Sequence, residues 1–182
     1  MPWVTLLQPD LILGSSILDL TPERLQEFNL KGLVLDVDDT LVPVSMSEAS
    51  PELREWVTSV RHTVDLWLVS NNISQSRISR IAKSLNVPYI LGAGKPSRRK
   101  LRQAVSAMGL PAEQVAMVGD RLFTDVLAGN RLGMFTILVE PMVNPAKMSH
   151  RHMLRDFEVW LSQSLGATLP FEQQNATNPD KL

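Results

Sequence analysis

The chain has 182 residues, of which 44% are hydrophobic, as expected for one folded domain. Its formal net charge is −1, so the molecule lacks the overall positive charge that is typical of nucleic-acid-binding proteins. It has no cysteine, so disulfides, thiolate metal sites and cysteine nucleophiles are excluded. No apolar run approaches the roughly 20 residues that span a bilayer, and residues 1–23 hold no lysine or arginine, unlike a secretory or organellar leader. We therefore expect a cytoplasmic protein that can meet a membrane only peripherally.

The predicted elements alternate between helix and strand. Thr21-Pro22-Glu23 starts a helix, because a capping hydroxyl precedes a proline at the first helical position. The run 32–37 is apolar enough for a central strand that is buried on both faces. By the same patterns we predict further strands at 64–70, 87–91, 115–119 and 135–140, and helices at 51–62, 73–85, 98–108, 124–132 and 153–165.

This alternation predicts an α/β fold: a doubly wound, mainly parallel, Rossmann-like sheet with helices on both faces. We expect a single domain over residues 1–166. Residues 167–182 are rich in proline, asparagine, glutamine and aspartate with few apolar anchors, which predicts a flexible tail.

The most informative segment is 33–41, where an apolar run leads into three carboxylates and a hydroxyl. Side chains alternate along a strand, so Asp36 and Asp38 can point into the same space while Val37 faces away. So many acids at one strand end would repel one another, which calls for a cation. Two carboxylates beside a divalent metal, one a nucleophile and one an acid/base, suit phosphoryl transfer through an aspartyl-phosphate. A polar turn or helix cap after a strand is the competing interpretation.

Three more polar motifs follow predicted strands: SNN at 70–72, GAGKP at 92–96 and GDRLFTD at 119–125. In an open parallel α/β sheet, ligands lie beyond the carboxyl ends of the strands. We therefore expect the polar groups of all four motifs around one crevice.

Taken in order, the motifs DxDxT, SNN, Lys-Pro and GDxxxTD resemble the haloacid dehalogenase superfamily of magnesium-dependent phosphohydrolases. Within it the chain is similar to the small YqeG-like branch, through the segment before the first motif, the SNN form of the second, and the run from 119 to 131. That branch includes phosphatases that act on phosphatidylglycerophosphate. The resemblance implies a phosphomonoesterase that uses Mg²⁺ and acts on an anionic phospholipid at a membrane surface.

The resemblance also implies the catalytic residues. Asp36 would attack phosphorus, while Asp38 would protonate the leaving alkoxide and then activate water. Lys95 would offset charge on Asp36 and on the phosphate, so it is both a catalytic and a substrate-binding residue. Asp39 is expected to face elsewhere.

Substrate and metal binding are assigned to residues of the same motifs. Ser70 and the backbone amide of Asn71 would hold phosphoryl oxygens, with Thr40 beside them mainly steadying its loop. Asp120 would bind the metal directly and Asp125 would support it through water or hydrogen bonds. Oxygen ligands, few protein groups and a substrate phosphate favour Mg²⁺. The full predicted sets are Thr40, Ser70, Asn71 and Lys95 for substrate, and Asp36, Asp38, Asp120 and Asp125 for metal.

The spacing of the motifs bears on the substrate. Neither residues 42–65 nor residues 73–94 can hold an extra folded domain, so the chain resembles the capless members of the superfamily. An open crevice suits a phosphate on something large, such as a lipid headgroup or a macromolecule. One alternative is a phosphatase of a soluble metabolite or phosphoprotein. A receiver-like phosphate-binding module is a remote alternative, because its lysine would come last whereas Lys95 precedes the GDRLFTD motif.

Three groups of residues are weaker candidates for lipid contact, because basic side chains attract anionic lipid and apolar ones can enter it. Solvated helix faces, and packing against the sheet for the leader, are the favoured interpretations. The groups are Arg98, Arg99, Lys100 and Arg102; Lys147, His150, Arg151, His152 and Arg155; and the leader residues Trp3, Leu6, Leu7, Leu11, Ile12 and Leu13.

Overall fold

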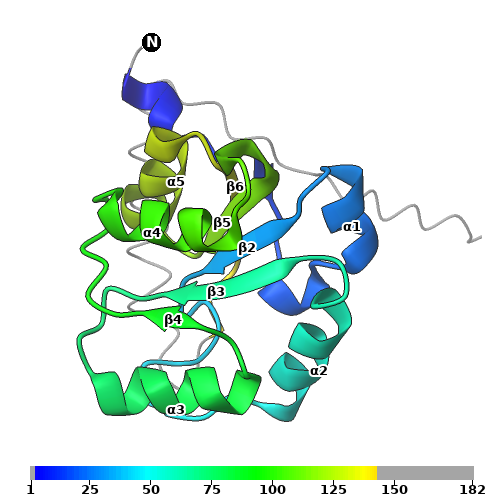
Figure 1. Cartoon of the computed structure of the whole chain (residues 1–182), viewed down its shortest axis with the longest axis vertical. Coiled ribbons are helices and arrows are strands. Elements are labelled where there is room, and N and C mark those ends of the chain that lie inside the picture. Colours follow the sequence, from blue (N-terminus) through cyan, green and yellow to red (C-terminus); the bar gives the residue numbers. More distant parts are fainter. Residues whose placement is uncertain (1–2, 143–182) are drawn as a thin grey trace, which may run out of the picture.

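A computed structural model describes residues 3–142 of the chain. Six strands form one sheet in the order β1-β6-β5-β2-β3-β4, and every pairing is parallel (Figure 1). The strands are β1 (Leu11–Ile12), β2 (Gly32–Leu35), β3 (Asp65–Val69), β4 (Tyr89–Ile90), β5 (Val115–Gly119) and β6 (Phe135–Leu138). The helices are α1 (Pro22–Glu27), α2 (Pro51–Val60), α3 (Gln75–Leu85), α4 (Arg99–Met108) and α5 (Leu127–Leu132). The predicted α/β fold is confirmed.

Side-chain caps set the helix starts. The Thr21 hydroxyl oxygen accepts the Arg24 amide at the start of α1, and Ser50 does the same for the Leu53 amide at the start of α2. In both helices a proline occupies the first position, as the sequence predicts. A cap of this kind stabilises a helix by about 1 kcal/mol. At the other end of α4, Gly109 adopts the left-handed conformation that stops the helix.

Two apolar layers hold the sheet, one on each face. Along β2, Leu33 and Leu35 belong to the core shared with α1, α2 and α3, while Val34 points into the core shared with α4 and α5. Figure 1 shows α2 and α3 on one side of the strands and α4 on the other. Because helices cover both faces, β2 is buried along its whole length.

All five predicted strands are present, and each of the five lies within its predicted range. The prediction missed β1, which pairs with β6 through Leu11↔Ile137 and Ile12↔Leu138, because two residues offer no period to detect. Leu7, Leu11 and Ile12 are buried, so packing of the leader against the sheet is confirmed.

Three helix starts differ from their predictions, and that of α4 differs by only one residue, at Arg99 instead of 98. The helix expected from residue 73 begins at Gln75, because the Asn72 side chain accepts the Ser74 amide and holds residues 72–74 in a turn. The helix expected from residue 124 begins earlier, as a π-helical turn at Leu122–Val126 that leads into α5.

The predicted helix at 153–165, the tail at 167–182 and the basic cluster from Lys147 to Arg155 lie outside the described residues. Within them, one loop and α2 occupy the interval between β2 and β3, and one loop and α3 occupy that between β3 and β4. Neither interval places an extra domain over the carboxyl edge of the sheet. Residues 3–142 contain no helix with both the length and the apolar character to cross a bilayer.

Candidate active site

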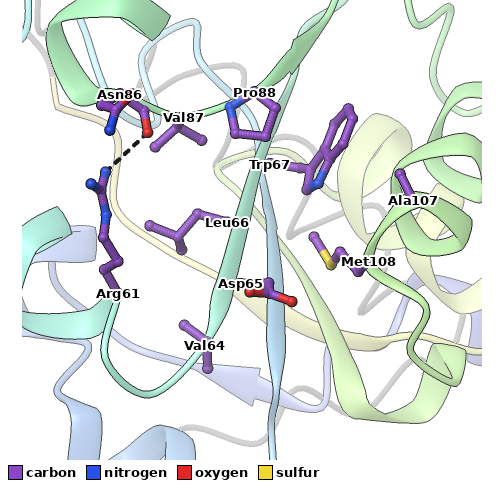
Figure 2. Close-up of a pocket in the computed structure, with 10 residues that line it drawn as sticks. All are labelled: Arg61, Val64, Asp65, Leu66, Trp67, Asn86, Val87, Pro88, Ala107 and Met108. Atoms are coloured by element: carbon purple, nitrogen blue, oxygen red, sulfur yellow. Dashed lines mark hydrogen bonds between the residues drawn. The ribbon is translucent and has the colours of Figure 1, made fainter.

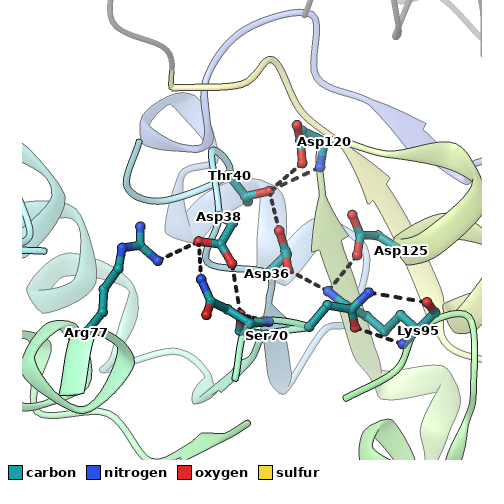
Figure 3. Close-up of polar contacts among 10 residues, drawn as sticks. Asp36, Asp38, Thr40, Ser70, Arg77, Lys95, Asp120 and Asp125 are labelled. Atoms are coloured by element: carbon teal, nitrogen blue, oxygen red, sulfur yellow. Dashed lines mark hydrogen bonds and ion pairs between the residues drawn. The ribbon is translucent and has the colours of Figure 1, made fainter. Parts of the chain in front are cut away.

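The carboxyl edge of the sheet brings together residues from four loops. Asp36 follows β2 directly, Ser70 follows β3, and Asp120 follows β5, while Lys95 lies in the loop after β4. Parallel strands present their carboxyl ends at one edge, so these side chains converge although their motifs are far apart in sequence (Figure 3).

Lys95 lies at the centre of the cluster. Its Nζ lies 2.6 Å from Asp36 Oδ1 and 2.6 Å from Asp125 Oδ1, and the residue is only 5% exposed. Burial alone would lower the pKa of Lys95, but the charges of Asp125 and Asp36 outweigh it and the pKa is raised. Lys95 is therefore a stable cation that holds two carboxylates in place.

Carboxylates outnumber this cation. Asp36, Asp120 and Asp125 each offer a carboxylate oxygen within 4.8 Å of the other two. Oδ2 of Asp125 is buried and has no hydrogen-bond partner among the described residues. When all groups are ionised, three carboxylates and one ammonium leave two negative charges in a buried space. The donor set and the charge therefore fit a divalent cation that prefers oxygen ligands, such as Mg²⁺.

Burial raises the pKa of two of these acids. Desolvation is the largest cause for Asp36, whose pKa is raised to about 6, although Lys95 counteracts it. The pKa of Asp120 is raised to about 7, first by burial and then by the charges of Asp125 and Asp36. In the protein alone these carboxylates resist ionisation, and a bound cation would reverse that preference.

Gly119, the last residue of β5, gives Asp125 the space it occupies. A Cβ at position 119 would lie 2.4 Å from Asp125 Cγ, well inside van der Waals contact. We expect Gly119→Ala to push the Asp125 carboxylate away from Lys95 and to weaken Mg²⁺ binding by about tenfold or more. Isothermal titration calorimetry with Mg²⁺ measures the effect.

A double-mutant cycle identifies the cause of that loss. If the added methyl group acts only by displacing the Asp125 side chain, Gly119→Ala should cost little further affinity in an Asp125→Gly background, which also removes the Cβ that would lie 2.6 Å from that methyl group. Additive losses from the two substitutions would contradict this explanation.

The Thr40 hydroxyl links the first motif to the last. Its oxygen lies 3.3 Å from Asp36 Oδ2 and 3.1 Å from Asp120 Oδ1, and it accepts the Asp120 amide at 3.1 Å. Thr40 is fully buried. This geometry suits a residue that braces two carboxylates. The expected steadying role of Thr40 and its predicted share in substrate binding stay predictions.

Asp38 lies on the side of Asp36 away from Asp125, and it does not belong to the cluster of three carboxylates (Figure 3). Its Oδ2 accepts the Ser70 hydroxyl at 3.0 Å, and its Oδ1 accepts the Arg77 guanidinium at 2.5 Å (Figure 3). The carboxylate is thus oriented by α3 and by the SNN motif. Its predicted share in metal binding stays a prediction.

Arg77, on α3, is the charged contact of the site that sequence reasoning missed. Besides Asp38 it contacts the loop after β2, donating to the carbonyls of Met46 and Pro43. The sequence did contain an indication of this contact, because Arg77 shares the face of α3 that buries Ile78, Ile81 and Leu85. A charge on such a face needs a partner.

Asn71 acts on Lys95 through its side chain. Its Nδ2 donates to the Lys95 carbonyl at 3.2 Å, and its Oδ1 accepts the Lys95 amide at 2.8 Å. This reciprocal pair fixes the backbone from which the Lys95 side chain extends. The predicted role of the Asn71 backbone amide in binding phosphate stays a prediction, and the side-chain role adds to it.

Asp39, as expected, faces away from the cluster. Its backbone has φ 65°, and its Oδ1 accepts the Val44 amide in the loop after β2.

The first basic cluster also contributes hydrogen bonds to the fold, since Arg98 donates to the Arg131 carbonyl and Arg131 donates to the Pro96 carbonyl. These two arginines connect the loop of Lys95 to α5.

A separate hollow of about 390 Å³ lies at the opposite, amino edge of β3 and β4 (Figure 2). Residues such as Asp65, Trp67 and Met108 line it, and Arg61 donates at its rim to the Asn86 carbonyl. None of the predicted site residues is among those that line it, so the chemistry is assigned to the carboxyl edge.

Comparison with known proteins agrees with this geometry. A sequence model of the HAD-hydrolase-like family matches residues 92–153. The chain is 40% identical over 130 residues to the probable phosphatase YqeG of Bacillus subtilis (strain 168), covering 71% of this chain and 75% of that protein. It is 28% identical over 149 residues to phosphatidylglycerophosphate phosphatase 1, chloroplastic, of Chlamydomonas reinhardtii, covering 76% of this chain and 55% of that protein.

Among solved structures, NagD from Escherichia coli K-12 aligns with a TM-score of 0.50 at 15% identity, over 66% of this chain and 92% of that chain. This likeness shows a shared fold. The identity to YqeG, over three quarters of that protein, shows more: the chain belongs to the YqeG family of haloacid dehalogenase-like phosphatases.

Proposed function

We propose that this phosphatase hydrolyses phosphatidylglycerophosphate to phosphatidylglycerol, with Mg²⁺ and through an aspartyl-phosphate on Asp36. The observation that carries the chemistry is the buried contact of Asp36 with Lys95, beside Asp120 and Asp125. A carboxylate held by a lysine next to a cation-binding cluster suits nucleophilic attack on a phosphomonoester.

The side chains divide the reaction into two steps. Asp36 attacks phosphorus while Asp38 donates a proton to the departing ester oxygen, which releases the alcohol. Asp38 then takes a proton from water as that water attacks the acyl phosphate, which releases inorganic phosphate and restores Asp36. General acid–base catalysis of this kind typically contributes about 10²–10⁴-fold.

Asp36, Asp120 and Asp125 are the residues that would hold Mg²⁺ in this proposal, and Asp38 is a further predicted ligand. The ion would supply positive charge that lets the phosphate approach a negative cluster. Lys95 provides a second, permanent cation, 2.6 Å from Asp36 Oδ1.

The lipid assignment rests on the open edge and on a relative. Within residues 3–142, the intervals after β2 and β3 place no domain over the site, which suits a phosphate on a large molecule. The Chlamydomonas relative is named for phosphatidylglycerophosphate, and the match extends over 76% of this chain. A lipid headgroup held at an interface brings its own positioning, which a small sugar phosphate in an open site lacks.

We expect kcat/KM for phosphatidylglycerophosphate in mixed micelles to exceed that for sugar phosphates and nucleotides by about a hundredfold or more. Phosphate release from a panel of these esters by the purified full chain measures it, with Asp36→Asn as the control for contaminating activity. Preference for a soluble ester would overturn the lipid assignment, whereas the family membership would stand.

A further inference from the structure

Exposed apolar side chains lie on two loops at the carboxyl edge of the sheet, beside the residues of the site. Within the described part of the chain, the large hydrophobic residues that are exposed are Val44 (45%), Met46 (47%) and Ile73 (85%). Val44 and Met46 lie in the loop between β2 and α2, and Ile73 lies in the loop between β3 and α3. Single exposed apolar residues are ordinary on a protein surface, but these share one edge. We call the three residues the apolar rim.

Hydrogen bonds tie the apolar rim to the residues of the site. The Arg77 guanidinium donates to the Met46 carbonyl at 2.7 Å and to the Pro43 carbonyl at 3.1 Å, while it also pairs with Asp38. Ile73 lies against the loop that carries Lys95, since a Cβ at Gly92 would be 3.6 Å from Ile73 Cγ2. The apolar rim is therefore held in place around the site.

Exposed cations lie on the two helices that begin at the edge of the apolar rim. α3 and α4 begin at the same edge of the sheet, and they expose Arg80 and Arg99. Arg80 donates to the Ser47 hydroxyl, directly after Met46. The loop also exposes an acid, Glu48, so attraction by charge alone is modest and apolar contact must contribute. Apolar side chains at the same edge as exposed cations match a bilayer with anionic headgroups over a hydrocarbon interior.

We propose that the apolar rim enters the surface of an anionic lipid bilayer, so that a phosphomonoester headgroup reaches Asp36 without leaving the membrane. This proposal rests on the proposed function and deepens it, because it names the surface that contacts lipid. The rim lies on loops of the first two motifs and against the loop of the third, so docking there would bring headgroups to the phosphate site.

Sedimentation with sucrose-loaded vesicles, made of equal parts phosphatidylcholine and phosphatidylglycerol, tests the proposal with the full chain. Two matched triple variants change the same positions: V44S/M46S/I73S removes the apolar character, and V44L/M46L/I73L keeps it. We expect the serine variant to lose vesicle binding by about tenfold or more, and the leucine variant to bind like the wild type. Thermal unfolding checks the fold, and I73S alone, at the most exposed position, serves if the serine variant is unstable.

Equal vesicle binding by the wild type and the serine variant would overturn the proposal, as would a wild type that does not bind. Loss of binding only on charge reversal at Arg80 and Arg99 would also overturn it, since charge alone would then explain the attraction. The micelle assay decides the proposed function separately. If the chain hydrolyses the lipid but does not bind vesicles, the proposed function stands and the proposed membrane contact of the apolar rim is wrong. If the chain binds vesicles through the rim but prefers soluble esters, the membrane contact stands and the proposed function is wrong.

Discussion

Asp36→Asn should reduce turnover by about 10⁴-fold or more while the protein remains folded. An amide oxygen is a far poorer nucleophile than a carboxylate. The other two acids of the cluster, Asp120 and Asp125, come from the segment after β5 and not from the end of β2, so neither is placed to replace Asp36. The asparagine side chain has the same shape, and its oxygen can still accept from Lys95 at the place of Asp36 Oδ1. Phosphate release from lipid and from p-nitrophenyl phosphate measures the loss of turnover, and circular dichroism checks that the variant remains folded.

Asp39→Asn is the matched control, since it changes the same charge in the same motif. Asp39 faces away from the cluster and holds the Val44 amide, a role that the asparagine oxygen can keep. We expect this variant to retain most of its activity. Appreciable turnover by a well-folded Asp36→Asn protein would rule out the covalent mechanism.

Without metal, the acid cluster should make the folded protein less stable as pH rises. Both raised pKa values, about 6 for Asp36 and about 7 for Asp120, lie above those of the unfolded chain, so the folded state binds more protons between about pH 4 and pH 7. The contribution of these groups to stability is therefore largest below about pH 4 and is lost as pH rises through 6 and 7. Mg²⁺ should stabilise the protein more at pH 8 than at pH 5, because at pH 5 it competes with protons.

Asp120→Asn isolates this effect. In chelator, we expect the variant to be more stable than the wild type at pH 8 by on the order of a few kcal/mol, with the difference shrinking toward pH 5. Urea unfolding across this range measures it. Asp65→Asn is the control, because Asp65 is an exposed carboxylate at the opposite edge of the sheet. A constant gap for Asp120→Asn across the range would contradict the explanation.

The sheet and the cluster of site residues were predictable because they follow from strand order and from one topological rule. Apolar runs that end in polar motifs mark β2, β3 and β5, and parallel pairing then brings Asp36, Ser70 and Asp120 to one edge. No knowledge of side-chain contacts was needed for that step.

The positioning contacts were not predictable in this way. Asn71 holds Lys95 across 24 positions, and Arg77 meets Asp38 across 39, so both depend on how separate loops pack. Sequence period places Arg77 on a helix face but not opposite a particular carboxylate. The turn that excludes Ile73 from α3 likewise depends on a local side-chain bond from Asn72, which competes with helix formation.

The outermost strands of the sheet have a consequence for self-association. β1 and β4 are two residues long each, so either border offers very few unpaired backbone groups to another chain. Proline lies just before each of them, at Pro9 with one residue between and at Pro88 directly, and its missing N–H further limits strand addition. A fully parallel sheet with long open borders would invite aggregation at high concentration. Among the described residues the two shortest strands are the ones at the borders, so we expect little tendency toward fibre-like growth through these edges.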